Sequence, residues 1–181
     1  MNQAAMADEQ GKILEGLQTA IRMETDGKAF YLKVSRESGN ETGRKLLESL
    51  AAEEDIHRRK FEEIFRAVRT RKGWPEIEAA PDRGETPETI FARATDAPVS
   101  EKRALATELG AVQTAMTMEN KSFDFYKAQS KKAQYDAQRA FYDALAAQER
   151  GHHQVLQDYY EYLADPVSWF VGKEHPSLDG G

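Results

Sequence analysis

The feature that most constrains the fold of this chain is an internal repeat with a constant offset. The segment LQTAIRMETDGKAFY (17–31) aligns with VQTAMTMENKSFDFY (112–126), and AAEEDIH (51–57) aligns with AAQERGH (146–152). The offset is 95 residues in both alignments, since 119 − 24 = 95 and 149 − 54 = 95, so no gap separates them. A repeat of this kind indicates two copies of one supersecondary unit. We therefore expect two helical hairpins with a common pattern.

Apolar residues in both copies recur at alternating steps of three and four, which is the spacing of helices packed in a bundle. The predicted helices span about 10–38, 43–71, 101–131 and 135–164, with a crossover at about 72–100 and a tail at 165–181. We expect one all-α domain over 1–181. Its fold class would be a four-helix bundle made of two pseudo-symmetric hairpins, with a short C-terminal helix or tail.

The two glutamates of each hairpin are equally far from its turn. Glu24 and Glu54 are 30 residues apart with Gly39 at the midpoint, and Glu119 and Glu149 are 30 apart around residue 134. In an antiparallel pair, residues equidistant from the turn lie at the same height, at about 1.5 Å rise per residue. Each pair of glutamates should therefore face one another.

The long crossover can bring all four glutamates to one layer. It is too long for a tight turn, and Thr86-Pro87 predicts a short helix that packs Ile90-Phe91 inward. A crossover that traverses the length of the bundle makes the second hairpin run opposite to the first. A two-fold pseudo-axis then passes through the middle of the bundle.

Six ionisable residues interrupt the apolar seams at this layer. Glu-x-x-His places a carboxylate and an imidazole on one helical face, and the motif occurs in both copies. Buried carboxylates are costly unless they are compensated, and no Lys or Arg falls at these positions. Two divalent cations would balance four carboxylates, and oxygen ligands with imidazole suit iron(II) or manganese(II). The predicted ligands are Glu24, Glu54, His57, Glu119, Glu149 and His152.

Tyr31 and Tyr126 follow Glu24 and Glu119 by seven residues on the same stripe. They are either ordinary core aromatics or hydrogen-bond donors to the carboxylates. His153 and His175 are expected at the surface. The same holds for four polar residues near the motifs, which are interpreted as solvated or interface positions: Glu53, Glu62, Glu63 and Gln148.

The charge and composition of the chain argue against several kinds of binding partner and cofactor. The net charge of −6 argues against nucleic acid, and no apolar run approaches the roughly 20 residues that a membrane helix needs. The start MNQAAMADEQGK has no secretory pattern, so a cytoplasmic location is expected. The chain contains no cysteine, which excludes disulfides, thiol catalysis and cysteine-ligated iron within it.

The pattern of Glu24 with Phe30-Tyr31, Glu54-x-x-His57, Glu119 with Phe125-Tyr126 and Glu149-x-x-His152 resembles the ferritin-like di-iron carboxylate superfamily. Within it the chain is most similar to the rubrerythrin family, over residues of about 10–165 and the tail. The resemblance implies a ferritin-like bundle with two iron ions, for which manganese or zinc can substitute. It also implies that Glu24 and Glu119 are terminal ligands, that Glu54 and Glu149 bridge, and that each histidine completes one ion.

The same resemblance implies a reaction and its partners. Such proteins reduce hydrogen peroxide or dioxygen at a diferrous site, and they are typically dimers. Rubrerythrins proper carry a rubredoxin domain with cysteines, so here the electrons are expected from a separate donor protein. Many also have a further carboxylate where this chain has Ser122. Two alternatives stay open: a ferroxidase or iron-handling protein, and a metal-stabilised helical interaction module without turnover.

Overall fold

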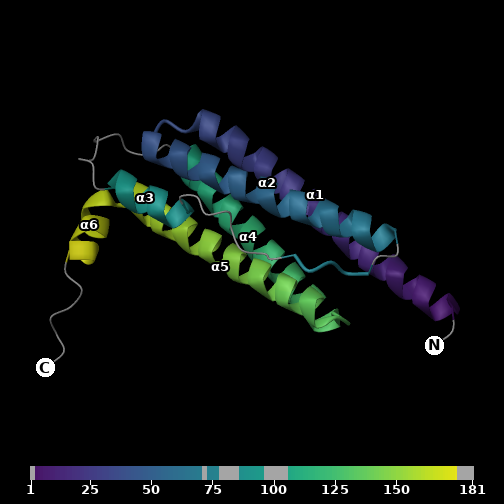
Figure 1. Ribbon diagram of the computed structural model, residues 1–181. Coiled ribbons are helices and arrows are strands. Elements are labelled where there is room, and N and C mark those ends of the chain that lie inside the picture. Colours follow the sequence, from purple (N-terminus) through teal and green to yellow (C-terminus); the bar gives the residue numbers. More distant parts are fainter. Residues whose placement is uncertain (1–2, 71–72, 78–85, 96–105, 175–181) are drawn as a thin grey trace, which may run out of the picture.

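The computed structural model describes residues 3–70, 73–77, 86–95 and 106–174, and their regular elements are all helices. Four long helices form an all-α bundle (Figure 1). Two short helices complete it, one in the crossover and one at the C-terminal end. The bounds are α1 Gln3–Glu37, α2 Glu41–Arg69, α3 Pro87–Thr95, α4 Ala106–Lys132, α5 Asp136–Ala164 and α6 Pro166–Glu174.

The helix ends repeat with the offset found in the sequence. The first helix of each hairpin ends at Glu37 and Lys132, and 132 − 37 = 95. The second helices begin at 41 and 136 and end at 69 and 164, again 95 apart. The predicted turn midpoints, Gly39 and Gln134, lie in the loops. The bundle of two pseudo-symmetric hairpins is therefore confirmed, although α1 begins earlier than the predicted residue 10.

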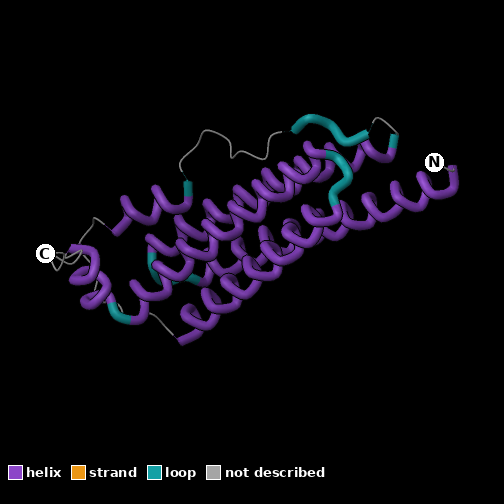
Figure 2. Tube along the Cα trace, turned by 90° about the horizontal axis from the view of Figure 1, so that it is seen from below, coloured by secondary structure: helices purple, strands orange, loops and turns teal. Residues whose placement is uncertain are grey.

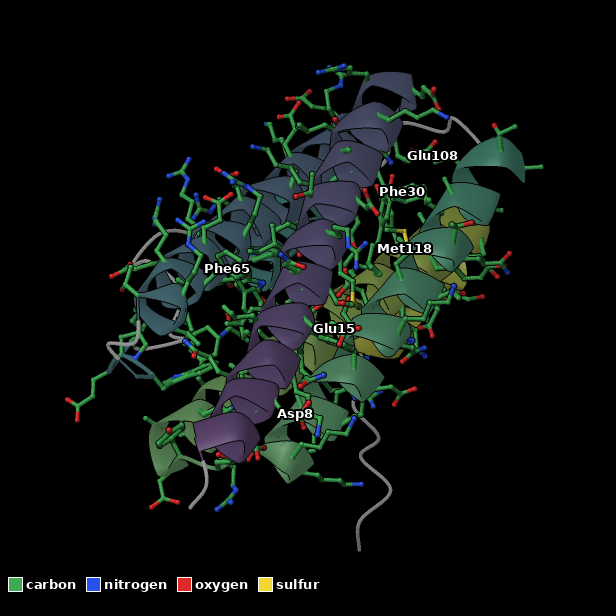
Figure 3. All side chains as sticks on the ribbon, turned by 90° about the vertical axis from the view of Figure 1, so that its right-hand side faces the viewer. Asp8, Glu15, Phe30, Phe65, Glu108 and Met118 are labelled. Carbon is green, nitrogen blue, oxygen red and sulfur yellow. The ribbon has the colours of Figure 1, made fainter. Side chains whose placement is uncertain are left out.

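The second hairpin runs opposite to the first. Figures 1 and 2 show α1 and α4 side by side but antiparallel, with the start of α1 and the short helix α6 at opposite ends of the bundle. Figure 3 looks onto α1 and shows α2 on one side of it and α4 on the other. Because α2 ends and α4 begins at opposite ends of the bundle, the crossover traverses its length, as expected. The predicted start of the third helix at 101 lies outside the described residues.

The crossover helix α3 attaches through one buried aromatic side chain. The Thr86 hydroxyl accepts a hydrogen bond from the backbone N–H of Thr89 at 3.3 Å, which caps the helix. Phe91 is buried and packs edge-on against Tyr159, Tyr162 and Trp169. The last of these belongs to α6, so α3 and α6 cover the same end of the bundle.

Two apolar clusters fill the bundle on either side of a polar layer. One contains Leu47, Leu50 and Leu156, and the other contains Leu17, Phe61 and Leu145. Tyr31 belongs to the first cluster and Tyr126 to the second. Burial of this apolar surface stabilises the bundle. Within the described residues no helix combines the length and apolar character that a membrane crossing requires.

Candidate metal centre

The polar layer gathers all six predicted residues in the middle of the bundle. Each is between 1 and 4 % exposed. Each of the four long helices contributes to the layer. Glu24 comes from α1, Glu54 and His57 from α2, Glu119 from α4, and Glu149 and His152 from α5.

Helix geometry explains why these side chains meet. The i, i+3 spacing puts Glu54 and His57 on the inner face of α2, about one turn apart, and α5 repeats this arrangement. The loops at 38–40 and 133–135 set the register of each hairpin. The antiparallel placement of the hairpins then superimposes the two pairs of glutamates in one layer.

The six residues form two overlapping groups. Ligand atoms of Glu24, Glu54, His57 and Glu149 lie within 4.8 Å of one another, and the second group is Glu54, Glu119, Glu149 and His152. Glu54 and Glu149 belong to both groups. Either group could hold a metal ion, and the two groups have two carboxylates in common.

The imidazoles present the same nitrogen to this cluster. Nδ1 of His57 lies 3.5 Å from Glu24 Oε2 and 3.5 Å from Glu149 Oε1. Nδ1 of His152 lies 3.5 Å from Glu119 Oε2 and 3.5 Å from Glu54 Oε1. Each histidine thus faces the first glutamate of its own hairpin and the shared glutamate of the other.

Five of the inward-facing atoms are buried without a hydrogen-bond partner. They are Glu24 Oε2, His57 Nδ1, Glu119 Oε2, Glu149 Oε1 and His152 Nδ1. Unpaired buried polar atoms are rare because each is costly. Separations of 3.5 Å suit co-ligands of one ion, since ligand atoms about 2.0–2.2 Å from a metal lie roughly 3–3.5 Å apart. The donor set therefore fits divalent metal ions.

Two tyrosine hydroxyls reach into the layer across the hairpin boundary. Tyr31 on α1 donates a hydrogen bond to Glu119 on α4, and Tyr126 on α4 donates to Glu24 on α1. Burial raises the pKa of both hydroxyls well above the usual value, so they remain donors. Both interpretations that the sequence left open describe these residues, since each ring lies in an apolar cluster and each hydroxyl donates to a carboxylate. The partner in each case is the glutamate of the opposite hairpin.

Without an ion, the four carboxyls separate into two pairs. Burial raises the pKa of Glu54 and Glu149 well above the ordinary value, and the charges of Glu24 and Glu119 raise it further. Burial alone would also raise the pKa of Glu24 and Glu119. The neighbouring Glu54 carboxyl and His152 imidazole, respectively, outweigh burial and lower the pKa of both. The shared carboxyls therefore hold the protons that incoming cations would displace.

Burial opposes the charged form of the His152 imidazole, but the neighbouring carboxylates of Glu119 and Glu53 outweigh it and raise the pKa of that imidazole well above its ordinary value.

Glu53 and Gln148 are not the solvated or interface positions that the sequence predicts, because both contact a histidine of the layer. Nε2 of His152 lies 2.8 Å from Glu53 Oε2, and Nε2 of His57 lies 2.8 Å from Gln148 Oε1. The repeat holds the signal that could have identified them. Both residues directly precede a shared glutamate, and 148 − 53 = 95.

The other flanking residues differ in burial. Glu63 is exposed as expected, whereas Glu62 is half-buried and pairs with Arg58. His153 is half-buried, and His175 lies outside the described residues.

Comparison with known proteins agrees with this arrangement. The family model described as rubrerythrin matches residues 15–108 and 110–177, which include all six residues of the layer. No curated protein and no solved structure matches the chain.

Proposed function

Because this chain belongs to the rubrerythrin family, we propose that its buried layer binds two iron ions and that the loaded protein reduces hydrogen peroxide or dioxygen. The observation that carries the proposal is the pair of four-residue groups that share Glu54 and Glu149. Four carboxylates with two neutral imidazoles balance two divalent charges. Oxygen ligands with one nitrogen per ion favour iron or manganese over softer metals.

The roles of the ligands follow from membership of the two groups. Glu24 with His57, and Glu119 with His152, each belong to one group only. They would be the terminal ligands of separate ions, while Glu54 and Glu149 would bridge them. Two adjacent ferrous ions would supply the two electrons that, with two protons, reduce hydrogen peroxide to two waters. Reduction of dioxygen to water needs four electrons and so would take two such turnovers.

The surrounding residues would orient the ligands and exclude water. The hydroxyls of Tyr31 and Tyr126 hold Glu119 and Glu24 by one oxygen each, and Oε2 of each glutamate faces the cluster without a hydrogen-bond partner. The apolar clusters above and below the layer keep bulk water out. The chain therefore offers a pre-organised site that needs only the cations and an oxidant.

Electrons would come from a separate protein. These 181 residues contain no cysteine, so they cannot build a cysteine-ligated iron centre to relay electrons. A donor must lie outside them. We further propose self-association, as is typical of rubrerythrin-like proteins.

Anaerobic loading with two equivalents of iron(II), followed by stopped-flow mixing with peroxide or dioxygen, tests the proposal. We expect a fast rise in the near-ultraviolet absorption of ferric iron, with one peroxide consumed per two irons. The variant E63Q, altered at an exposed glutamate, serves as the matched control. Iron that stays ferrous would refute the proposal and favour a metal-stabilised module. Uptake of far more than two irons per chain would favour iron storage.

A further inference from the structure

The Nε2 atoms of the two imidazoles, which are not the nitrogens that face the cluster, hydrogen-bond to different chemical groups. Nε2 of His152 on α5 bonds to the Glu53 carboxylate on α2, and Nε2 of His57 on α2 bonds to the Gln148 amide on α5. The two acceptors occupy equivalent positions in the repeat, 95 residues apart. The two hydrogen bonds have the same length, 2.8 Å, but their acceptors differ in charge.

These acceptors set which ring nitrogen carries the hydrogen. An ionised carboxylate has no hydrogen to donate, so Nε2 of His152 must be the donor in its bond to Glu53. In the neutral ring, which is the form that binds a metal, Nδ1 then carries the lone pair, and this atom is buried without a hydrogen-bond partner next to Glu54 and Glu119. The Gln148 oxygen acts in the same way on His57, whose Nδ1 is likewise buried without a hydrogen-bond partner.

The hydrogen bonds to the two histidines differ in strength. A hydrogen bond to a carboxylate is roughly twice as strong as one to a neutral oxygen. A carboxylate partner also makes the opposite ring nitrogen a better electron-pair donor to a metal. Glu53 is 14 % exposed in its side chain, so solvent screens its charge only in part. His152 is therefore the stronger ligand of the two.

We propose that Glu53 and Gln148 are positioning residues that make the two halves of the centre inequivalent, so that the ion held by His152 and Glu119 binds more tightly than the ion held by His57 and Glu24. The inference rests on the two-ion site proposed above. It goes beyond that proposal because the six ligands alone form a nearly symmetric set. The asymmetry comes from residues that touch no ion.

Cobalt(II) titration of the metal-free protein tests this inference without any turnover. Visible absorption and calorimetry would follow occupancy of each half. In the wild type we expect two binding steps whose dissociation constants differ by about 10- to 100-fold, the usual effect of such partners. H152A should lose the tighter step and H57A the weaker one. Two equal steps in the wild type would overturn the inference.

Exchanging the two acceptors separates this role from a purely structural one. E53Q places amides behind both rings and should weaken the tighter step about 10- to 100-fold, leaving the two halves alike. Q148E should make them alike by tightening the weaker step. The double variant E53Q/Q148E should restore two unequal steps, with H57A now removing the tighter one. A structural role predicts no such reversal, so unequal steps that stay assigned to His152 in the double variant would overturn the inference.

Matched measurements distinguish the possible failures. E63Q removes a charge from an exposed position of the same helix and should leave both cobalt steps unchanged. Circular dichroism of the metal-free variants identifies any that do not fold, and Q148E still tests the inference if E53Q is one of them. Unequal cobalt steps with iron inert to peroxide would refute the proposed function alone. Equal steps with rapid peroxide reduction would refute only this inference, and absence of cobalt binding would overturn both.

Discussion

The two hairpins share their centre and differ around it. At equivalent positions both have Glu, Tyr, Glu and His in the polar layer, and both have helix ends in register. Outside that layer, equivalent positions in the two hairpins carry different residues that make different contacts. Lys28 pairs with Asp55 at 2.8 Å in the first hairpin, whereas the equivalent residues in the second are Phe123 and Arg150, with the guanidinium 4.2 Å from the ring centroid.

Further differences occur where the hairpins turn. The Asn40 side chain caps α2 by accepting from the backbone N–H of Thr42, but the equivalent Tyr135 provides no side-chain cap for α5. Gly43 lies so close to Tyr159 that a Cβ there would overlap its hydroxyl, whereas the equivalent residue is Gln138. The comparison teaches that the hairpins agree at the candidate metal ligands and differ where side chains only pack the bundle or end its helices.

Removal of a shared carboxylate should have the largest effect. E54A and E149A each remove a ligand common to both groups, so both should lose two-ion binding altogether. E24A and E119A remove one terminal ligand and should each retain about one ion. Elemental analysis after anaerobic loading measures this stoichiometry. Retention of two ions by E54A or E149A would show that these carboxylates do not bridge.

The pH dependence of stability should be the next largest effect, and both hairpins contribute with the same sign. Glu54 and Glu149 have folded pKa values above the ordinary 4.5, so without metal their contribution is fully present below that value and is lost as pH rises. His152, whose pKa is raised above 6.5, acts in the same direction. Bound ions displace these protons, so metal should stabilise more at high pH.

Thermal melts of loaded and metal-free protein measure this effect. The difference in Tm should widen by at least about 2–4 °C between about pH 5 and about pH 8, if it reflects 1 kcal/mol or more. In the metal-free protein, the double variant E54Q/E149Q should remove most of the fall in Tm with rising pH. A difference that shrinks as pH rises would contradict the assignment of protons to the shared carboxyls.

Replacement of Gly43 in the first hairpin should have a smaller effect on stability. G43A forces a methyl group into the Tyr159 side chain and should lower the free energy of unfolding by about 1–3 kcal/mol. The helical Gly110 has no neighbouring atom within 4 Å of the position that a methyl group would occupy, so the control G110A should stabilise by roughly 0.5–1 kcal/mol. Urea denaturation of the metal-free proteins measures both. A G43A variant as stable as the wild type would show that the ring moves aside freely.

The helix caps should give the smallest effect and opposite signs in the two hairpins. N40A removes the cap of α2 and should destabilise by about 1 kcal/mol, whereas Y135N supplies the missing cap of α5 and should stabilise by a similar or smaller amount. Denaturant midpoints at constant slope compare the two variants. Equal effects of the same sign would contradict the difference between the turns.

Much of the layer could be predicted because it follows from local rules. The repeat defined two hairpins, the distance from each turn placed Glu24 opposite Glu54, and the i, i+3 spacing put His57 beside them. All of these depend on helix periodicity, which is a property of neighbouring residues. The start of α1 was placed too late because its first turns carry little of the apolar pattern on which that prediction relied.

Contacts between the two hairpins could not be predicted from helix periodicity. Tyr31 bonds to Glu119 and Tyr126 to Glu24, and Glu53 and Gln148 support histidines on the opposite hairpin. The amino-acid sequence by itself determined the hairpins, their register and the six polar residues of the seam, because each depends on helical spacing within one copy. Only the tertiary structure decided which hydroxyl, carboxylate or amide supports which ligand, because those partners depend on how the two hairpins are rotated and offset against each other.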